Sequence, residues 1–207
     1  MTNLDMKKTL KHLYNPSAKA VSVVDVPPVT YLMIDGKGNP NTAQRYQDAI
    51  PALYKIAYGI RAIFKAKGEV FTVMPLEGLW EFEGQEEHDM TPLTEIQKDK
   101  FIWTLMILQP EGVTQNIFEQ ARDNARGKDA PVLLDDVRLE TYHEGEAVQI
   151  MHIGAYEDET DNIVKLHNHI SDNGWTISGK HHEIYLSDPR KVAAEKLKTV
   201  IRQPFTR

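Results

Sequence analysis

The sequence of 207 residues contains no cysteine, so disulfide bonds and catalysis by a thiol are both excluded. It has no excess of positive charge either, because 24 lysines and arginines face 30 aspartates and glutamates, for a formal net charge of -6. A broad basic surface for nucleic acid is therefore not expected. No apolar run approaches the roughly 18 residues of a membrane span, and residues 1–11 are too polar for a signal peptide. These absences predict a cytoplasmic protein without nucleic-acid or membrane partners.

Metal centres and phosphate-binding loops also lack their signatures. The eight histidines include one adjacent pair, His181 and His182, and adjacent residues of a strand face opposite sides of a sheet. No group of residues has the spacing of a zinc site. Gly36 and Gly38 are followed neither by a third glycine nor by a lysine and a serine, as a phosphate loop would require. We therefore expect neither a metal nor a cofactor.

The composition is that of a globular domain, with 41% hydrophobic and 26% charged residues, and the length can bury a sizeable core. Apolar periodicity predicts a long helix over residues 42–67, with a kink or a break at Pro51, and shorter helices after Thr114 and after residues 158–160. Strands are predicted at 29–34, 70–74, 79–82, 101–108, 137–142, 147–153, 175–177, 182–186 and 197–205. The polar segment 143–146 between two of these strands predicts a hairpin.

The order strand, helix, strand, strand occurs twice, first over residues 29–82 and again over residues 147–186. We interpret this order as a duplicated half-domain, with halves at about 21–110 and 132–207, inside a single domain of residues 1–207. The halves predict an α+β fold in which tandem strand-helix-strand-strand repeats form one antiparallel sheet. Both helices are expected on one face of this sheet, and a ligand cleft on the other face.

The stretch 180–189 (KHHEIYLSDP) carries the candidate chemistry. In a strand, Glu183 and Tyr185 share one face, while Ile184 and Leu186 point to the other face and favour a core. A strand that lines a cleft can use the carboxylate to meet a positive charge or to take a proton, and the phenol to stack or to donate a hydrogen bond. A solvated strand carries the same alternation without any function.

The repeat also predicts which residues lie across from this pair. Trp80 or Glu81 of the first half is expected roughly opposite Glu183 or Tyr185 of the second half. The ligand cleft is therefore expected where the two halves meet.

Large aromatic side chains are the candidate walls of this cleft. Trp80 shares its strand face with Phe82, and Trp103 lies on a strongly apolar predicted strand. Such rings suit flat polycyclic ligands by offset stacking, and cations through the ring face. Tyr54 and Tyr58, one turn apart on the long helix, either reach the edge of the cleft or pack against the sheet. The alternative for each tryptophan is a place in the ordinary core.

Two motifs resemble the GyrI-like small-molecule-binding family: residues 26–40 (VPPVTYLMIDGKGNP) and 182–189 (HEIYLSDP). The similarity extends through Phe205. The closing stretch 195–204 (EKLKTVIRQP) and the insertion at 84–128 are most similar to the family's stand-alone members. The resemblance implies the tandem fold described above and an aromatic pocket with an acidic residue, which binds cationic or flat polycyclic compounds.

Some stand-alone members are hydrolases of cyclopropanoid natural products that alkylate DNA. The resemblance therefore implies a cofactor-free hydrolase that opens a cyclopropane ring and protects the cell. In this hypothesis, Trp80 and Trp103 clamp the flat ligand, Tyr185 or another phenol donates to the developing phenolate, and Glu183 activates water. The family's acidic position maps onto Glu183.

The alternative hypothesis is a non-catalytic protein that binds or sequesters several drugs. The same pocket would serve, with Glu183 opposite the charge of a cationic ligand. In both hypotheses the expected partner is a small aromatic or cationic molecule. A third possibility, an inhibitor that binds a DNA-handling enzyme, is supported only by the acidic net charge.

Overall fold

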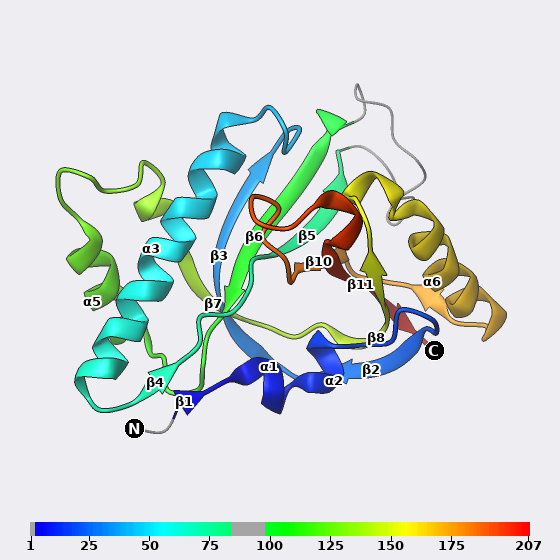
Figure 1. Cartoon of the computed structure of the whole chain (residues 1–207), viewed down its shortest axis with the longest axis horizontal. Helices are drawn as coiled ribbons and strands as arrows, with labels where there is room; N and C mark the ends of the chain where they lie inside the picture. Colours follow the sequence, from blue (N-terminus) through cyan, green and yellow to red (C-terminus); the bar gives the residue numbers. More distant parts are fainter. Residues whose placement is uncertain (1–2, 84–97) are drawn as a thin grey trace.

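The computed structural model describes residues 3–83 and 98–207 and has one large sheet at its centre (Figure 1). The main path of the sheet is β2-β8-β11-β10-β5-β6-β3-β7, every neighbouring pair is antiparallel, and β9 pairs with β11 at the side. Its strands are β2 (Ser22–Val26), β3 (Val29–Lys37), β5 (Glu77–Phe82), β6 (Phe101–Leu108), β7 (Arg138–Tyr142), β8 (Gly145–Ile153), β9 (Thr176–Ile177), β10 (His181–Tyr185) and β11 (Lys198–Thr206). Helices pack against this open sheet, so the predicted α+β class is confirmed.

The strand order consists of two matching halves that meet at the centre of the sheet. The first half is β3, α3 (Gln44–Ala66), β5 and β6, and the second half is β8, α6 (Thr160–Asp172), β10 and β11. β5 and β10 pair at the junction. The outer strands are exchanged, because β2 pairs with β8 of the second half and β7 pairs with β3 of the first.

Two sequence predictions about strands are wrong. The strand predicted at 70–74 is the short β4 (Val70–Phe71), which pairs in parallel with β1 (Asn3–Leu4) outside the large sheet, and Pro75 lacks the N–H that would extend a ladder toward β5. The predicted hairpin of β7 and β8 does not form either. These strands lie at opposite ends of the sheet, because β8 pairs with β2 on one edge and with β11 on the other.

The other helices are α1 (Met6–Thr9), α2 (Lys11–Tyr14) and α5 (Gln115–Ala125), with 3-10 turns at Leu134–Asp136, Tyr156–Asp158 and Ala194–Lys196. α3 continues through Pro51, and Thr114 caps α5 as predicted, since its hydroxyl accepts a hydrogen bond from the N–H of Ile117. No helix within residues 3–83 and 98–207 is long and apolar enough to cross a membrane. Residues 84–97, in the insertion singled out by the sequence, lie outside the described residues.

A row of cross-strand neighbours shows that both long helices cover the same face of the sheet. The row runs through Ile150, Ile201, Glu183, Gly78, Leu105 and Ile34. At one end, Ile150 and Ile201 pack with Leu166 and Ile170 of α6. Near the other end, Tyr46 of α3 contacts the ring of Trp103, which lies on the same face as Leu105. The middle of the row is therefore on the helix-covered face, between α3 and α6.

In the middle of the opposite face, α2 packs against the sheet, and α1 and α2 follow each other near the N-terminus (Figure 1). There the Tyr14 hydroxyl donates to Glu77, and Arg202 donates to the carbonyl oxygen of Leu13. The Glu183–Tyr185 pair, which was expected in a ligand cleft on the face without the long helices, is therefore not on that face. Buried charges on that face bind α2, and the Glu183–Tyr185 pair lies on the side of α3 and α6.

Candidate functional site

Strand β10 places Glu183 and Tyr185 on the helix-covered face, at the junction of the two halves. Its register with β5 pairs His181 with Trp80 and Glu183 with Gly78. Because cross-strand partners share a face, His181 and Trp80 point to the same side as Glu183 and Tyr185. Trp80 thus lies where the internal repeat predicts it.

A chain of hydrogen bonds joins three of these side chains. The indole N–H of Trp80 donates to the Tyr185 hydroxyl at 3.0 Å, and this hydroxyl donates to Oε2 of Glu183 at 2.7 Å. Burial and the charge of Glu183 raise the pKa of Tyr185 well above its usual range, so the phenol keeps the proton that it donates. The Glu183 side chain is 16% exposed, so the carboxylate is held by the protein and still reaches the surface.

Two glycines make room for the tryptophans. A Cβ at Gly78 would lie 2.8 Å from Nε1 of Trp80, and a Cβ at Gly36 would lie 2.1 Å from the Trp103 ring. Both separations are shorter than van der Waals contact. Replacing either glycine by a larger residue would therefore displace the tryptophan that packs on it. Trp103 is fully buried and donates from Nε1 to the carbonyl oxygen of Gly38 at 3.3 Å.

Aromatic rings from two strands and one helix surround this chain. The ring of Tyr46, in the first turn of α3, lies 5.9 Å from the Trp80 ring and 5.2 Å from the Trp103 ring. The ring of Phe101 lies 5.1 Å from Trp80 and 4.6 Å from Phe82. Trp80, Trp103 and Phe82, which the sequence nominated, therefore belong to one cluster, and Tyr46 connects it to the helix.

A second carboxyl group enters from the start of α6. Glu159 is the N-cap residue, but its side chain makes no capping hydrogen bond and is buried, with 4% exposure. It lies beside Glu183 and Thr199, and Thr199 is the cross-strand neighbour of Tyr185. Burial and the charge of Glu183 raise the pKa of Glu159 well above the usual range of a carboxyl, so Glu159 holds a proton at neutral pH.

Unpartnered buried polar atoms gather around Glu183. Within the described part of the chain, Oε1 of Glu159, Oγ1 of Thr199 and both ring nitrogens of His181 have no hydrogen-bond partner. His181 is 2% exposed, and its Nε2 lies 3.4 Å from Oε1 of Glu183. Such atoms are few in native proteins, and a concentration of them is typical of a functional site.

Tyr54 and Tyr58 lie farther along α3 from this cluster. Their rings stack on each other at 6.2 Å, and Tyr58 is 57% exposed. At 1.5 Å per residue they lie about 12 and 18 Å along the helix from Tyr46. Their role at the edge of a ligand site therefore stays a prediction.

Sequence reasoning missed four residues of the cluster: Tyr46, Tyr156, Glu159 and His181. Tyr156 packs edge-on against Tyr185, with the ring centroids 5.7 Å apart. The repeat carried a signal for the first three residues, because it equates the starts of α3 and α6 and brings both to the junction. Alternate residues of a strand share a face, so His181 is expected beside Glu183 and Tyr185, but the predicted strand began one residue too late to include it.

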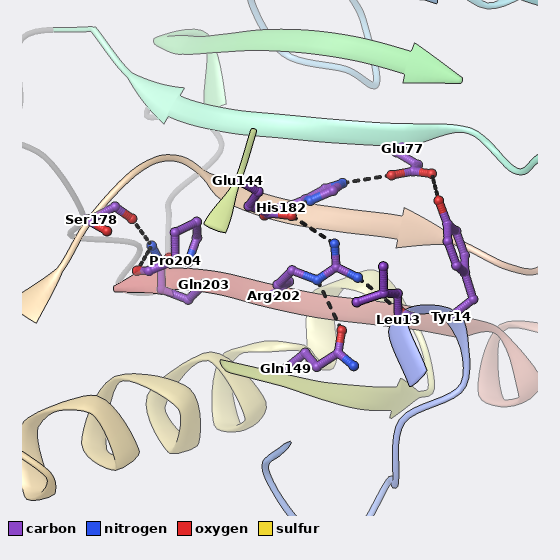
Figure 2. Close-up of polar contacts among 10 residues, drawn as sticks. All are labelled: Leu13, Tyr14, Glu77, Glu144, Gln149, Ser178, His182, Arg202, Gln203 and Pro204. Carbon is purple, nitrogen blue, oxygen red and sulfur yellow. Dashed lines mark hydrogen bonds and ion pairs between the residues drawn. The ribbon is translucent and has the colours of Figure 1, made fainter. Parts of the chain in front are cut away.

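A second polar cluster lies on the opposite face of the same strands (Figure 2). His182 stands between two carboxylates, with Nε2 3.0 Å from Oε2 of Glu77 and Nδ1 2.9 Å from Oε1 of Glu144. Arg202 donates to Oε2 of Glu144 at 2.8 Å and to the carbonyl oxygen of Leu13 at 2.9 Å. The four charged side chains are at most 2% exposed.

The charges of this second cluster compensate one another. Burial alone would lower the pKa of His182, but the charge of Glu144 and hydrogen bonds to Glu144 and Glu77 raise it to about 9. Burial alone would raise the pKa of Glu144, but His182 and Arg202 lower it to about 2. Because the protein itself supplies the partners, this cluster anchors α2 to the sheet and is not a candidate ligand site.

The helix-covered cluster, in contrast, has the groups that a ligand site needs. Aromatic rings offer faces for stacking, and an oriented carboxylate can balance a positive charge or take a proton from water. Among residues 3–83 and 98–207, no group of three or more histidines, cysteines, aspartates or glutamates is arranged to hold a metal ion.

Comparisons with known proteins agree with this fold. Residues 19–205 match a family model described as the GyrI-like small molecule binding domain. The structure of an uncharacterized conserved protein from Listeria innocua has a TM-score of 0.88 and 37% identity, over 98% of this chain and 100% of that chain. Two hydrolases from Listeria innocua have TM-scores of 0.83 and 0.85 with 36% and 35% identity, over 98% and 99% of this chain and 100% of theirs. No curated protein matches the sequence.

Proposed function

Because the chain belongs to the GyrI-like small-molecule-binding family, we propose that its helix-covered cluster binds flat, hydrophobic or cationic polycyclic compounds. The observation that carries this proposal is a half-buried carboxylate, Glu183, held by the Tyr185 hydroxyl among the rings of Tyr46 and Trp80. The rings offer stacking to a flat molecule, and the carboxylate offers charge compensation to a cation. The fully buried ring of Trp103 packs against the ring of Tyr46 in a T-shaped contact.

The proposed reaction is hydrolytic opening of an electrophilic cyclopropane, without a cofactor. Glu183 takes a proton from water, the water oxygen bonds to a ring carbon, and the carbon–carbon bond that breaks sends its electron pair to the conjugated carbonyl oxygen. Two similar proteins described as hydrolases, and the resemblance to cyclopropanoid hydrolases, favour this reaction class. Such an activity would protect a cell from DNA-alkylating compounds.

The hydrogen bonds give Tyr185 a different role from the one first expected. Its single proton is directed to Glu183, and its oxygen accepts the N–H of Trp80. In the proposed mechanism, Tyr185 is therefore a positioning residue that orients the base, and another group donates to the oxygen on which negative charge develops.

Incubation of the purified protein with a spirocyclopropyl dienone tests the proposed reaction. The expected product is the substrate plus one water, detected by mass spectrometry, and it should form much more slowly with Glu183→Gln. Unchanged substrate at high enzyme loading, across several analogues, would contradict the hydrolase proposal.

A non-catalytic drug-binding protein is the second candidate, and the same carboxylate among aromatic rings favours it. Titration with a lipophilic cation, followed by tryptophan fluorescence, measures binding at the cluster. The signal reports on this site because Trp80 belongs to it and donates a hydrogen bond to Tyr185. Saturable binding of the cation, with no hydrolysis of any cyclopropane, would support this candidate over the enzyme.

A further inference from the structure

Glu159 is a buried acid that has no role in the ring-opening reaction proposed for Glu183. It lies beside Glu183 at the start of α6, it is 4% exposed, and its Oε1 has no hydrogen-bond partner within residues 3–83 and 98–207. Burial of a polar group without a partner is unfavourable, so a free oxygen here calls for a function.

The N–H of Trp80 and the O–H of Tyr185 already donate hydrogen bonds within the cluster. Trp80 donates to Tyr185, and Tyr185 donates to Glu183. A ligand oxygen in this cluster must therefore find its donor elsewhere. Among the described residues of this cluster, His181 has unused atoms beside Trp80 on the β5 side, and Glu159 and the Thr199 hydroxyl have them on the α6 side. Of the two groups on the α6 side, the carboxylic acid is the one that can also transfer its proton at neutral pH.

We propose that Glu159 is a second catalytic residue of this site, whose carboxylic acid donates a hydrogen bond to a carbonyl oxygen of the ligand and gives that oxygen a proton during ring opening. This inference rests on the proposed function. Burial and the neighbouring charge of Glu183 raise the pKa of Glu159 and keep this acid protonated beside the proposed base.

The step balances in atoms and charge. The oxygen of water bonds to the cyclopropane carbon, and the broken carbon–carbon bond sends its electron pair through the dienone to the carbonyl oxygen. Glu183 takes the proton that water loses, and the carbonyl oxygen takes the proton of Glu159 and becomes a phenol. Proton transfer from Glu183 to Glu159 then restores both groups, without any further reactant.

A pair of flat probes separates this hydrogen bond from stacking. 9-Fluorenone has a carbonyl oxygen and fluorene does not, while both offer the same aromatic area. The wild-type protein should bind fluorenone roughly three- to tenfold more tightly than fluorene, the usual worth of one hydrogen bond. Glu159→Met should remove this preference, Glu159→Gln should keep it through the amide N–H, and the exposed neighbour Glu157→Gln should behave as wild type.

Turnover of a spirocyclopropyl dienone provides the second readout. Glu159→Met and Glu159→Gln should both lower kcat by about 10²–10³-fold, because neither can give a proton to the oxygen. If the wild type binds both probes equally, or if both Glu159 variants keep the wild-type preference and kcat, the Glu159 proposal is overturned while the binding function stands. If neither probe binds saturably, the proposed function fails and this inference fails with it.

Discussion

His182 should make the stability of this protein fall in alkaline solution. In the folded protein its pKa is about 9, against an ordinary value of 6.5, because Glu144 and Glu77 flank the ring. A group whose pKa is raised on folding stabilises the protein fully below the unfolded value and loses this contribution as pH rises to the folded value. At about 1.4 kcal/mol per pKa unit, the free energy of unfolding should fall by about 3 kcal/mol between pH 6 and pH 9.

Urea unfolding between pH 6 and pH 9 measures this loss, and NMR of the histidine rings identifies its source. One histidine resonance should titrate near pH 9, and it should persist in His143→Gln, a control at an exposed histidine on the adjacent segment. The variant His182→Gln should be less stable at pH 6, with a flatter pH dependence. Constant stability over this range, with every histidine titrating below pH 8, would contradict the placement of a charged His182 between the two carboxylates of Figure 2.

Three substitutions test the packing of the fold and the site. Tyr185→Phe releases Glu183 and leaves the Trp80 N–H without an acceptor, so turnover should drop about tenfold and unfolding free energy by about 1–3 kcal/mol; unchanged values would contradict the hydrogen-bond chain. Gly78→Ala should reduce stability by about 1–3 kcal/mol in urea unfolding and shift the tryptophan emission, and a neutral effect would contradict the close approach of Trp80. Thr114→Ala should reduce stability by about 1 kcal/mol through the lost cap of α5, and equal urea midpoints would refute that role.

Local patterns predicted the central part of the candidate site well. The alternation of side chains along a strand is sufficient to place Glu183 and Tyr185 on one face, and the internal repeat is sufficient to bring Trp80 near them. Turn residues and apolar periodicity likewise predicted α3 and the cap of α5 at Thr114. Each of these features depends on neighbours within a few residues or on a repeated order of elements.

Features that depend on the global topology escaped sequence reasoning. The face of the Glu183–Tyr185 pair was predicted wrongly because Ile184 indicated only that one side of β10 is buried, while both sides are: α3 and α6 lie over one, and α2 contacts the other. The predicted hairpin of β7 and β8 fails because β7 pairs with β3, while β8 pairs with β2 and β11, and Glu144 between them accepts a hydrogen bond from Arg202. In the sequence Glu159 is one of several acidic residues around the start of a helix, and only its burial beside Glu183 distinguishes it from them.

The rate of hydrolysis of a spirocyclopropyl dienone by wild type and Glu183→Gln, measured in single turnover, tests the central claim most directly. The substitution keeps the size of the side chain and removes the base, so the rate should fall by about 10²–10⁴-fold. Glu81→Gln is the matched control, because Glu81 lies on the adjacent strand β5, faces the opposite side and pairs with Lys180 at the surface. A large fall for Glu183→Gln with an unchanged rate for the control is the predicted result, and equal rates for wild type and Glu183→Gln would contradict the account.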